Sequence, residues 1–165
     1  LNFSDFTLFN SLLLTALIFA VATIGYAKKT SSTYVAYETE CLGVALDGSQ
    51  TLVAWGGGKT RLDAKEQAMK TALNDVIFKG IRSGNDLCDT KPLVFAPNAR
   101  EKYEDFFNRF FSEDGDYKKF VTDDEGGRRL NRTKELSKLQ KKFGIVVTVY
   151  RPQLKEYLKS NGIIK

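Results

Sequence analysis

The chain has 165 residues, of which 42% are hydrophobic, and a formal net charge of +5; this suits one folded domain and argues against a disordered chain. It contains no histidine and two cysteines, which excludes Ser–His and Cys–His catalysis and leaves too few ligands for a structural zinc site. We therefore predict a protein that is not an enzyme and holds no metal or cofactor.

The chain begins with an apolar segment. Residues 6–27 carry no charge, and two lysines follow at once. A run of this length predicts an apolar helix that is either a cleaved secretory signal or a retained membrane anchor. Small side chains at Gly25 and Ala27 favour cleavage between Ala27 and Lys28, so we predict a signal peptide over residues 1–27. Retention is the alternative, and the two lysines would then favour a cytoplasmic domain.

The two cysteines bear on the same question. Export would bring Cys41 and Cys88 into an oxidising compartment, where they can form a disulfide. That bond would stabilise the fold by about 4 kcal/mol by restricting the unfolded chain. Two buried free thiols are the alternative. Neither cysteine lies where a lipid-attachment motif requires one.

The folded part is expected to open with a β-hairpin. Residues 28–33 form a polar linker, and residues 34–165 are predicted to be a single domain. Residues 34–46 favour a strand, the Asp-Gly pair that follows favours a two-residue turn, and residues 51–55 favour the returning strand.

A helix is expected next. Thr60 and Asp63 have the spacing of a capping box, and the helix is predicted to reach about Ile81. Its small apolar residues recur at helical spacing: Ala64, Ala68, Ala72 and Val76. Such a stripe allows close packing on a sheet.

The glycines before this helix raise the question of phosphate binding. Gly58, Lys59 and Thr60 match the end of the phosphate-binding loop signature. The first glycine of that signature, however, would fall at Val53, which belongs to the preceding strand. We therefore predict no nucleotide binding.

A second helix is expected after a loop. Residues 82–97 are predicted to be mostly loop, with a short strand at residues 93–95, and Asn98 with Glu101 predicts another capping box. The helix then carries an aromatic stripe: Tyr103, Phe106, Phe107, Phe110 and Phe111. We interpret the stripe as core. An exposed docking face formed by Tyr103, Phe107 and Phe111 is the alternative.

The last third of the domain is polar before it becomes apolar again. Residues 112–142 are predicted to be a mobile loop whose carboxylates lack the spacing of a calcium site. Residues 144–150 form the clearest strand, and Pro152 is placed to begin a closing helix that Gly162 ends.

Basic side chains gather between residues 128 and 151, beginning with Arg128 and Arg129. No nucleic-acid-binding signature accompanies them, so we interpret them as a solvated edge. If the aromatic stripe is buried, this edge is the predicted partner surface.

Several of these segments together resemble a known family. They are residues 41–44, residues 51–55, the three glycines that follow, the alanine-spaced helix and the strand–helix pair over residues 145–158. The pattern, which spans about residues 35–164, is similar to the N-terminal domain of the flagellar-ring protein FlgT and to related small bacterial envelope lipoproteins. The resemblance implies an α+β domain that is a structural or adaptor part of an envelope assembly, and it brings no catalytic residue. The chain departs from the family in a longer region over residues 83–142 and in lacking the lipid-attachment cysteine.

We therefore expect a two-layer α+β domain, with an antiparallel sheet and helices on one face, after an N-terminal apolar helix. The expected function is binding a protein partner in a cell-envelope assembly, in the periplasm or another extracytoplasmic space. We expect no nucleic acid, nucleotide or cofactor, and membrane contact only through the N-terminal segment. The alternatives are a membrane-anchored subunit and a histidine-free hydrolase that uses a pair of carboxylates.

Overall fold

The computed structural model describes residues 37–123, 133–137 and 140–165, and side chains over residues 37–123 and 142–165. These residues belong to one compact unit, Ala36–Lys165. The apolar segment, the cleavage site between Ala27 and Lys28, and the basic pair Arg128 and Arg129 lie outside the described residues.

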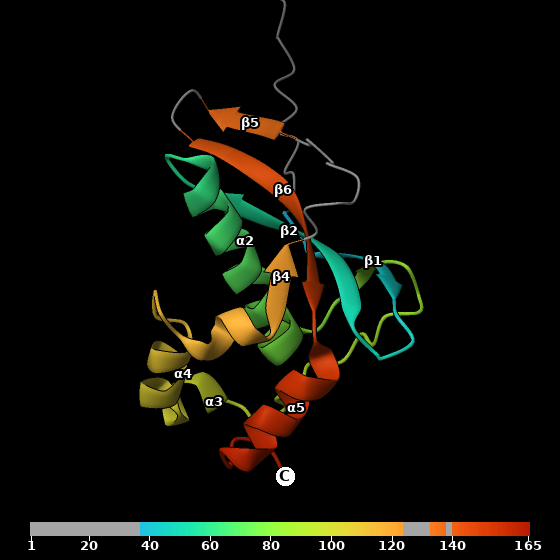
Figure 1. The fold of residues 1–165 in the computed structure, drawn as a ribbon, viewed down its shortest axis with the longest axis vertical. Coiled ribbons are helices and arrows are strands. Elements are labelled where there is room, and N and C mark those ends of the chain that lie inside the picture. The colour runs from blue at the N-terminus through green and yellow to red at the C-terminus, as the bar shows by residue number, and fades with distance from the viewer. Residues whose placement is uncertain (1–36, 124–132, 138–139) are drawn as a thin grey trace, which may run out of the picture. The chain divides into compact units, whose positions relative to one another are not determined.

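The described part of the chain is an α+β fold with one six-stranded sheet (Figure 1). The strand order is β3–β1–β2–β6–β4, and β5 also pairs with β6. The strands are β1 Glu40–Val44, β2 Gln50–Gly57, β3 Ser83–Gly84, β4 Val121–Asp123, β5 Thr133–Ser137 and β6 Gln140–Val149. All neighbours are antiparallel except β1 and β3, which are parallel. The sheet is therefore mixed, and the expectation of a wholly antiparallel sheet was wrong, because β3 arrives by a crossover through the first helix.

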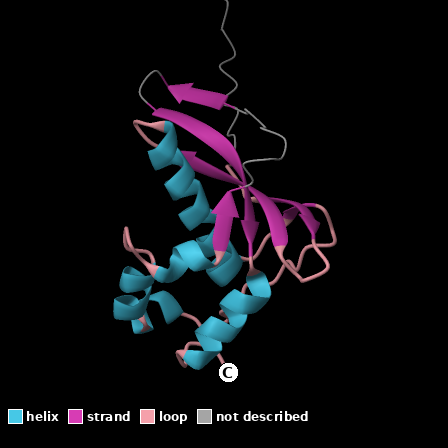
Figure 2. Cartoon of the chain, in the orientation of Figure 1, coloured by secondary structure: helices cyan, strands magenta, loops and turns pink. Residues whose placement is uncertain are grey.

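The helices are α2 Arg61–Asn74, a π-helix η1 Asp75–Lys79, α3 Ala99–Lys102, α4 Glu104–Phe110, a 3₁₀-helix η2 Asp116–Lys119 and α5 Arg151–Ser160. Helix α2 packs against β2, β6 and β4. In Figure 2 the strands occupy the upper half and the shorter helices gather in the lower half.

The β1–β2 hairpin is confirmed, but its turn is longer than predicted. Val44 pairs with Gln50, so five residues connect the strands instead of two. The Asp47 carboxylate accepts hydrogen bonds from the Ser49 amide at 2.9 Å and from the Ser49 hydroxyl at 2.6 Å. Asp47 therefore closes a local turn with its side chain, which competes with the two-residue hairpin turn.

The capping box of α2 is confirmed. The Asp63 amide donates to the Thr60 hydroxyl at 3.1 Å, and the Thr60 amide donates to the Asp63 carboxylate at 3.0 Å. The alanine stripe is buried against the sheet. A Cβ atom on Gly56 would lie 1.9 Å from the Ala64 carbonyl oxygen. The approach of β2 to α2 at this position is therefore too close for any residue type other than glycine.

The second predicted capping box was wrong. Asn98 has a left-handed backbone, with φ of 57°, and makes no side-chain capping hydrogen bond. A capping side chain reaches the helix amides from an extended backbone, which Asn98 does not have. The helix also breaks at Tyr103 into α3 and α4.

The prediction that residues 112–142 form one mobile loop was wrong. They contain η2, β4, β5 and the start of β6. Tyr117 and Val121 within them are buried in the core, so packing against the rest of the domain overrides the polar composition of this stretch.

Candidate functional site

The end of α2 winds as a π-helix, a form that frequently occurs at functional sites. The Gly80 amide donates to the Asp75 carbonyl at 2.7 Å, five positions back. Gly80 then turns the chain with φ of 78°. Because this amide reaches Asp75, it leaves the Val76 carbonyl available, and the Ile77 carbonyl is available because the helix ends there.

Those two carbonyls hold the following loop. The Leu93 amide donates to Val76 at 3.0 Å, and the Val94 amide donates to Ile77 at 2.9 Å. Residues 93–95 were predicted to form a strand, and they form none. The Leu93 and Val94 amides are satisfied by a helix end instead of a neighbouring strand.

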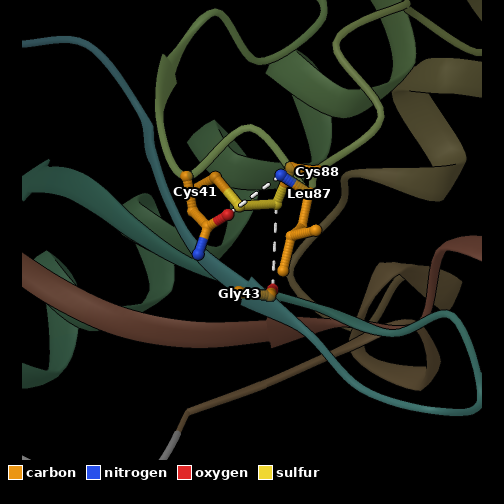
Figure 3. Close-up of a disulfide and its surroundings, with 5 residues drawn as sticks. Cys41, Gly43, Leu87 and Cys88 are labelled. Carbon is orange, nitrogen blue, oxygen red and sulfur yellow. Dashed lines mark hydrogen bonds between the residues drawn. A yellow bond between two sulfur atoms is a disulfide. The ribbon is translucent and has the colours of Figure 1, made fainter.

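A disulfide fixes the same loop to the sheet, which confirms the predicted pairing. Cys41 in β1 and Cys88 in the loop are bonded, with their Cα atoms 6.1 Å apart, and both are buried. Figure 3 shows the bond joining β1 to the loop that carries Leu87 and Cys88. The Asn85 amide also donates to the Cys41 carbonyl at 2.9 Å.

Arg151 fixes the loop from the other side. The guanidinium of this buried residue lies 2.9 Å from the Asp89 carboxylate and donates to the Lys91 carbonyl at 2.7 Å. Desolvation opposes ionisation of Asp89, but the Lys91 amide and the Arg151 charge outweigh it and hold the pKa of Asp89 below its ordinary value. The loop is thus attached to β1, to the π-helix and to α5.

Two hollows lie beside the π-helix, and Phe78 and Lys79 line both of them. The first has a volume of about 490 Å³ and lies between the helix end and the loop. We call it the Phe78 groove. Its lining residues are Asn74, Phe78, Lys79, Pro92 and residues 94–100.

The second hollow, of about 500 Å³, has a buried carboxylate in its wall. The Thr39 hydroxyl donates to Asp75 at 2.6 Å, and the Lys79 ammonium lies 2.8 Å from the other Asp75 oxygen. The carboxylate is therefore paired, as a buried charge requires. These bonds tie the segment that enters β1 to the π-helix.

The Phe78 groove combines an apolar wall with positive charge. Phe95 in that wall is 70% exposed, and Pro92 and Pro97 stiffen the backbone on either side of it. The Arg100 guanidinium donates to the Asn74 side-chain oxygen at 2.7 Å and lies 5.8 Å from the Phe78 ring centre. A binding site needs such a pairing of apolar surface with a few oriented polar groups.

A third hollow tests the carboxylate-pair hypothesis. It has a volume of about 360 Å³ and is lined by Asp114 and Asp116, among others. Asp116 accepts a hydrogen bond from the Tyr157 hydroxyl at 2.6 Å and pairs with Lys119 at 2.6 Å. Hydrogen bonds from Lys119 and then Tyr157 lower the pKa of Asp116, whereas a carboxylic acid that donates a proton near neutral pH needs a raised one. Asp116 does not fit the general acid of such a pair.

No metal or membrane site is found in the part of the chain that the structure describes. Over those residues no three Cys, Asp or Glu side chains are grouped to hold a metal ion. No helix there has the length and apolar character to cross a membrane.

The glycines of the apparent phosphate loop have a packing explanation. A Cβ atom on Gly58 would lie 2.5 Å from the Cβ of Asp63. The Gly57 amide donates to the Gln67 side chain at 2.8 Å. The turn between β2 and α2 is tight, and its glycines are explained without a bound phosphate.

The aromatic stripe lies in the core, as its spacing predicted. Phe107 is only 2% exposed, which overturns the alternative that it is part of an exposed docking face. Tyr103 and Phe111 are half-buried and pack against the same core. The other predicted partner surface starts at Arg128 and Arg129, outside the described residues.

Sequence reasoning missed the Phe78 groove. Phe78, Phe95 and Arg100 lie on three different elements and share no spacing pattern. The available signal was the apolar Leu-Val-Phe-Ala run between Pro92 and Pro97, which is too short for a core element of its own.

Comparison with known proteins finds no matching family model, no similar curated protein and no similar solved structure.

Proposed function

We propose that this chain is an exported, non-catalytic protein that binds a protein partner within a cell-envelope assembly, and that the Phe78 groove takes part in that binding. The observation that carries the proposal is the disulfide between Cys41 and Cys88. Such bonds persist in the periplasm and in secreted proteins and are rare in a reducing cytosol. The charge-free run over residues 6–27 supports export independently.

The resemblance to the flagellar-ring family supports the same proposal. That family combines an α+β domain with a role in envelope assembly, and we propose the two-layer form of the fold, after an N-terminal apolar helix, for this chain. The basic stretch over residues 128–151 is a second surface that we propose for partner contact.

A membrane-anchored subunit is the second candidate, because residues 6–27 are long enough to span a bilayer. It would keep the same domain and the same groove. The two candidates differ in whether the segment is removed and, if it is retained, in whether the two lysines after it hold the domain on the cytoplasmic side.

The proposed contact is tested by photo-crosslinking in the cells that make the protein. A photoreactive phenylalanine replaces Phe95 in one variant and Leu62 in a control, because Leu62 is also exposed, at 64%, but lies at the start of α2. We expect a discrete crosslinked protein in the envelope fraction from position 95 only. Equal crosslinking from both positions, or none from position 95, contradicts a role of the groove in binding.

A further inference from the structure

The eleven residues that line the Phe78 groove include two cations and no carboxylate. Lys79, one of the cations, is already paired with Asp75 at 2.8 Å. Arg100, the other, is exposed and donates to a neutral amide oxygen, that of Asn74. Among the described residues Arg100 makes no ion pair, so the groove has an uncompensated positive charge.

The position of Arg100 suits a carboxylate that comes from outside. One guanidinium nitrogen is held by Asn74, and the plane lies over the Phe78 ring, which leaves further N–H groups of the guanidinium to donate. An arginine held by a neutral partner and an aromatic ring is oriented before the ligand arrives, which lowers the entropy lost on binding.

The apolar wall suits a side chain beside that carboxylate. Phe95 is 70% exposed, and aromatic side chains and arginine are both enriched at the centres of protein–protein interfaces. Two prolines and the hydrogen bonds of Leu93 and Val94 to the π-helix hold the wall in place.

From these observations we infer that the Phe78 groove binds an acidic peptide segment of a protein partner, in which an apolar side chain packs on Phe95 and a neighbouring carboxylate pairs with Arg100. This inference rests on the proposed function and names the chemistry of the partner segment. The carboxylate can belong to an Asp or Glu side chain or to a free carboxyl terminus, and the probes below separate the two.

The test uses the oxidised full chain and three fluorescent short peptides, with binding measured by fluorescence anisotropy. The first is blocked at both ends and contains Phe followed by Asp; the second has Asn in place of that Asp; the third ends in Phe with a free carboxyl group. A charge-assisted pair with Arg100 should make the first or the third peptide bind roughly tenfold more tightly than the second.

Two pairs of variants locate the binding. Arg100→Gln should reduce the affinity for the carboxylate peptide to that of the neutral one, whereas Arg61→Gln, which removes an exposed arginine at the start of α2, should leave it unchanged. Phe95→Ser should weaken all the peptides, and Leu62→Ser should not. Equal binding of carboxylate and neutral peptides, equal effects of Arg100→Gln and Arg61→Gln, or no binding at all would overturn the inference.

Failure of this inference and failure of the proposed function give different results. If position 95 crosslinks to an envelope protein while the carboxylate peptides do not bind, the binding role stands and the acidic partner segment is wrong. If the peptides bind but the cysteines are reduced in the cell, the groove stands and export is wrong.

Discussion

The guanidinium of Arg151 lies 2.9 Å from the carboxylate of Asp89, although 62 positions separate the two residues in the chain. Arg151 begins α5, and Asp89 belongs to the loop that forms one wall of the Phe78 groove. The contact therefore connects the closing helix of the domain to its candidate binding site.

Replacing Arg151 should destabilise the domain more than replacing its partner. Arg151→Met removes the bonds to both Asp89 and the Lys91 carbonyl, and we expect a loss of about 2 kcal/mol in the free energy of unfolding, because one carbonyl acceptor is left without its partner. Asp89→Asn keeps an acceptor at an exposed position and should cost less than about 1 kcal/mol. Urea unfolding measures the free energy of unfolding of both variants. Equal losses would contradict the conclusion that Arg151 holds the loop through two bonds.

Reducing the disulfide should weaken the fold and loosen the groove wall. The Cys41–Cys88 bond closes a separation of 47 residues, for which the restriction of the unfolded chain predicts a stabilisation of about 4 kcal/mol. Urea unfolding with and without a reductant measures this loss. Amide hydrogen exchange should then quicken first in residues 85–91, and unchanged exchange there would contradict the attachment of the loop.

Adding one methyl group at the close approach of β2 and α2 should be severely destabilising. Gly56→Ala places a Cβ atom against the Ala64 carbonyl, and we expect a loss of about 3 kcal/mol or more. Gly43→Ala is the matched control, because no atom lies within 4 Å of the position that its added Cβ would take, and its effect should stay within about 0.5 kcal/mol. Thermal unfolding measures both effects. A mild effect of Gly56→Ala would show that β2 and α2 pack less tightly at this position than the structure describes.

Replacing a buried phenylalanine should destabilise the domain far more than replacing an exposed one. Phe107→Ala empties a core position and should cost about 4 kcal/mol, whereas Phe95→Ala should change the stability by less than about 0.5 kcal/mol. Chemical denaturation of both variants tests this contrast. If Phe107→Ala folds with native stability, the aromatic stripe is not the core that the structure describes.

The Tyr157 hydroxyl should ionise at an unusually high pH. Burial, followed by its hydrogen bond to Asp116, raises the pKa of Tyr157 from 10.0 to about 12. The folded state holds this proton more tightly than the unfolded state, so the stability it contributes is complete below pH 10 and is lost as the pH rises toward 12. The phenolate absorbance of the native protein minus that of Tyr157→Phe gives the midpoint directly. A midpoint near 10 would contradict the contact.

Local signals in the sequence predicted two features that depend on neighbouring residues, the start of α2 and the end of α5, although the local signals at Asp47 and Asn98 failed. The capping box joins Thr60 to Asp63. The end of α5 likewise depends on Gly162, whose amide donates to Lys159 while the Ile163 amide donates to Leu158, the pattern of a helix-terminating Schellman motif. In both cases all the atoms involved lie within five positions of one another.

Three of the features that escaped prediction depend on contacts between distant residues. The parallel pairing of Glu40 with Ser83 requires the whole crossover through α2. The path of residues 93–95 depends on the carbonyls of Val76 and Ile77 at the helix end, and nothing in the spacing of Asp75 to Lys79 distinguishes a π-helix from the α-helix before it. The groove could not be predicted because it forms where the end of the π-helix meets this loop.

Export with an intact disulfide is tested by the intact mass of the protein recovered from the cells that make it, under conditions that trap free thiols, before and after reduction. We expect a species in the extracytoplasmic fraction that is lighter by two hydrogen atoms before reduction and carries no thiol label, because Cys41 and Cys88 are bonded. Recovery of the protein with both cysteines labelled would contradict this expectation, since the chain would then fold in a reducing compartment.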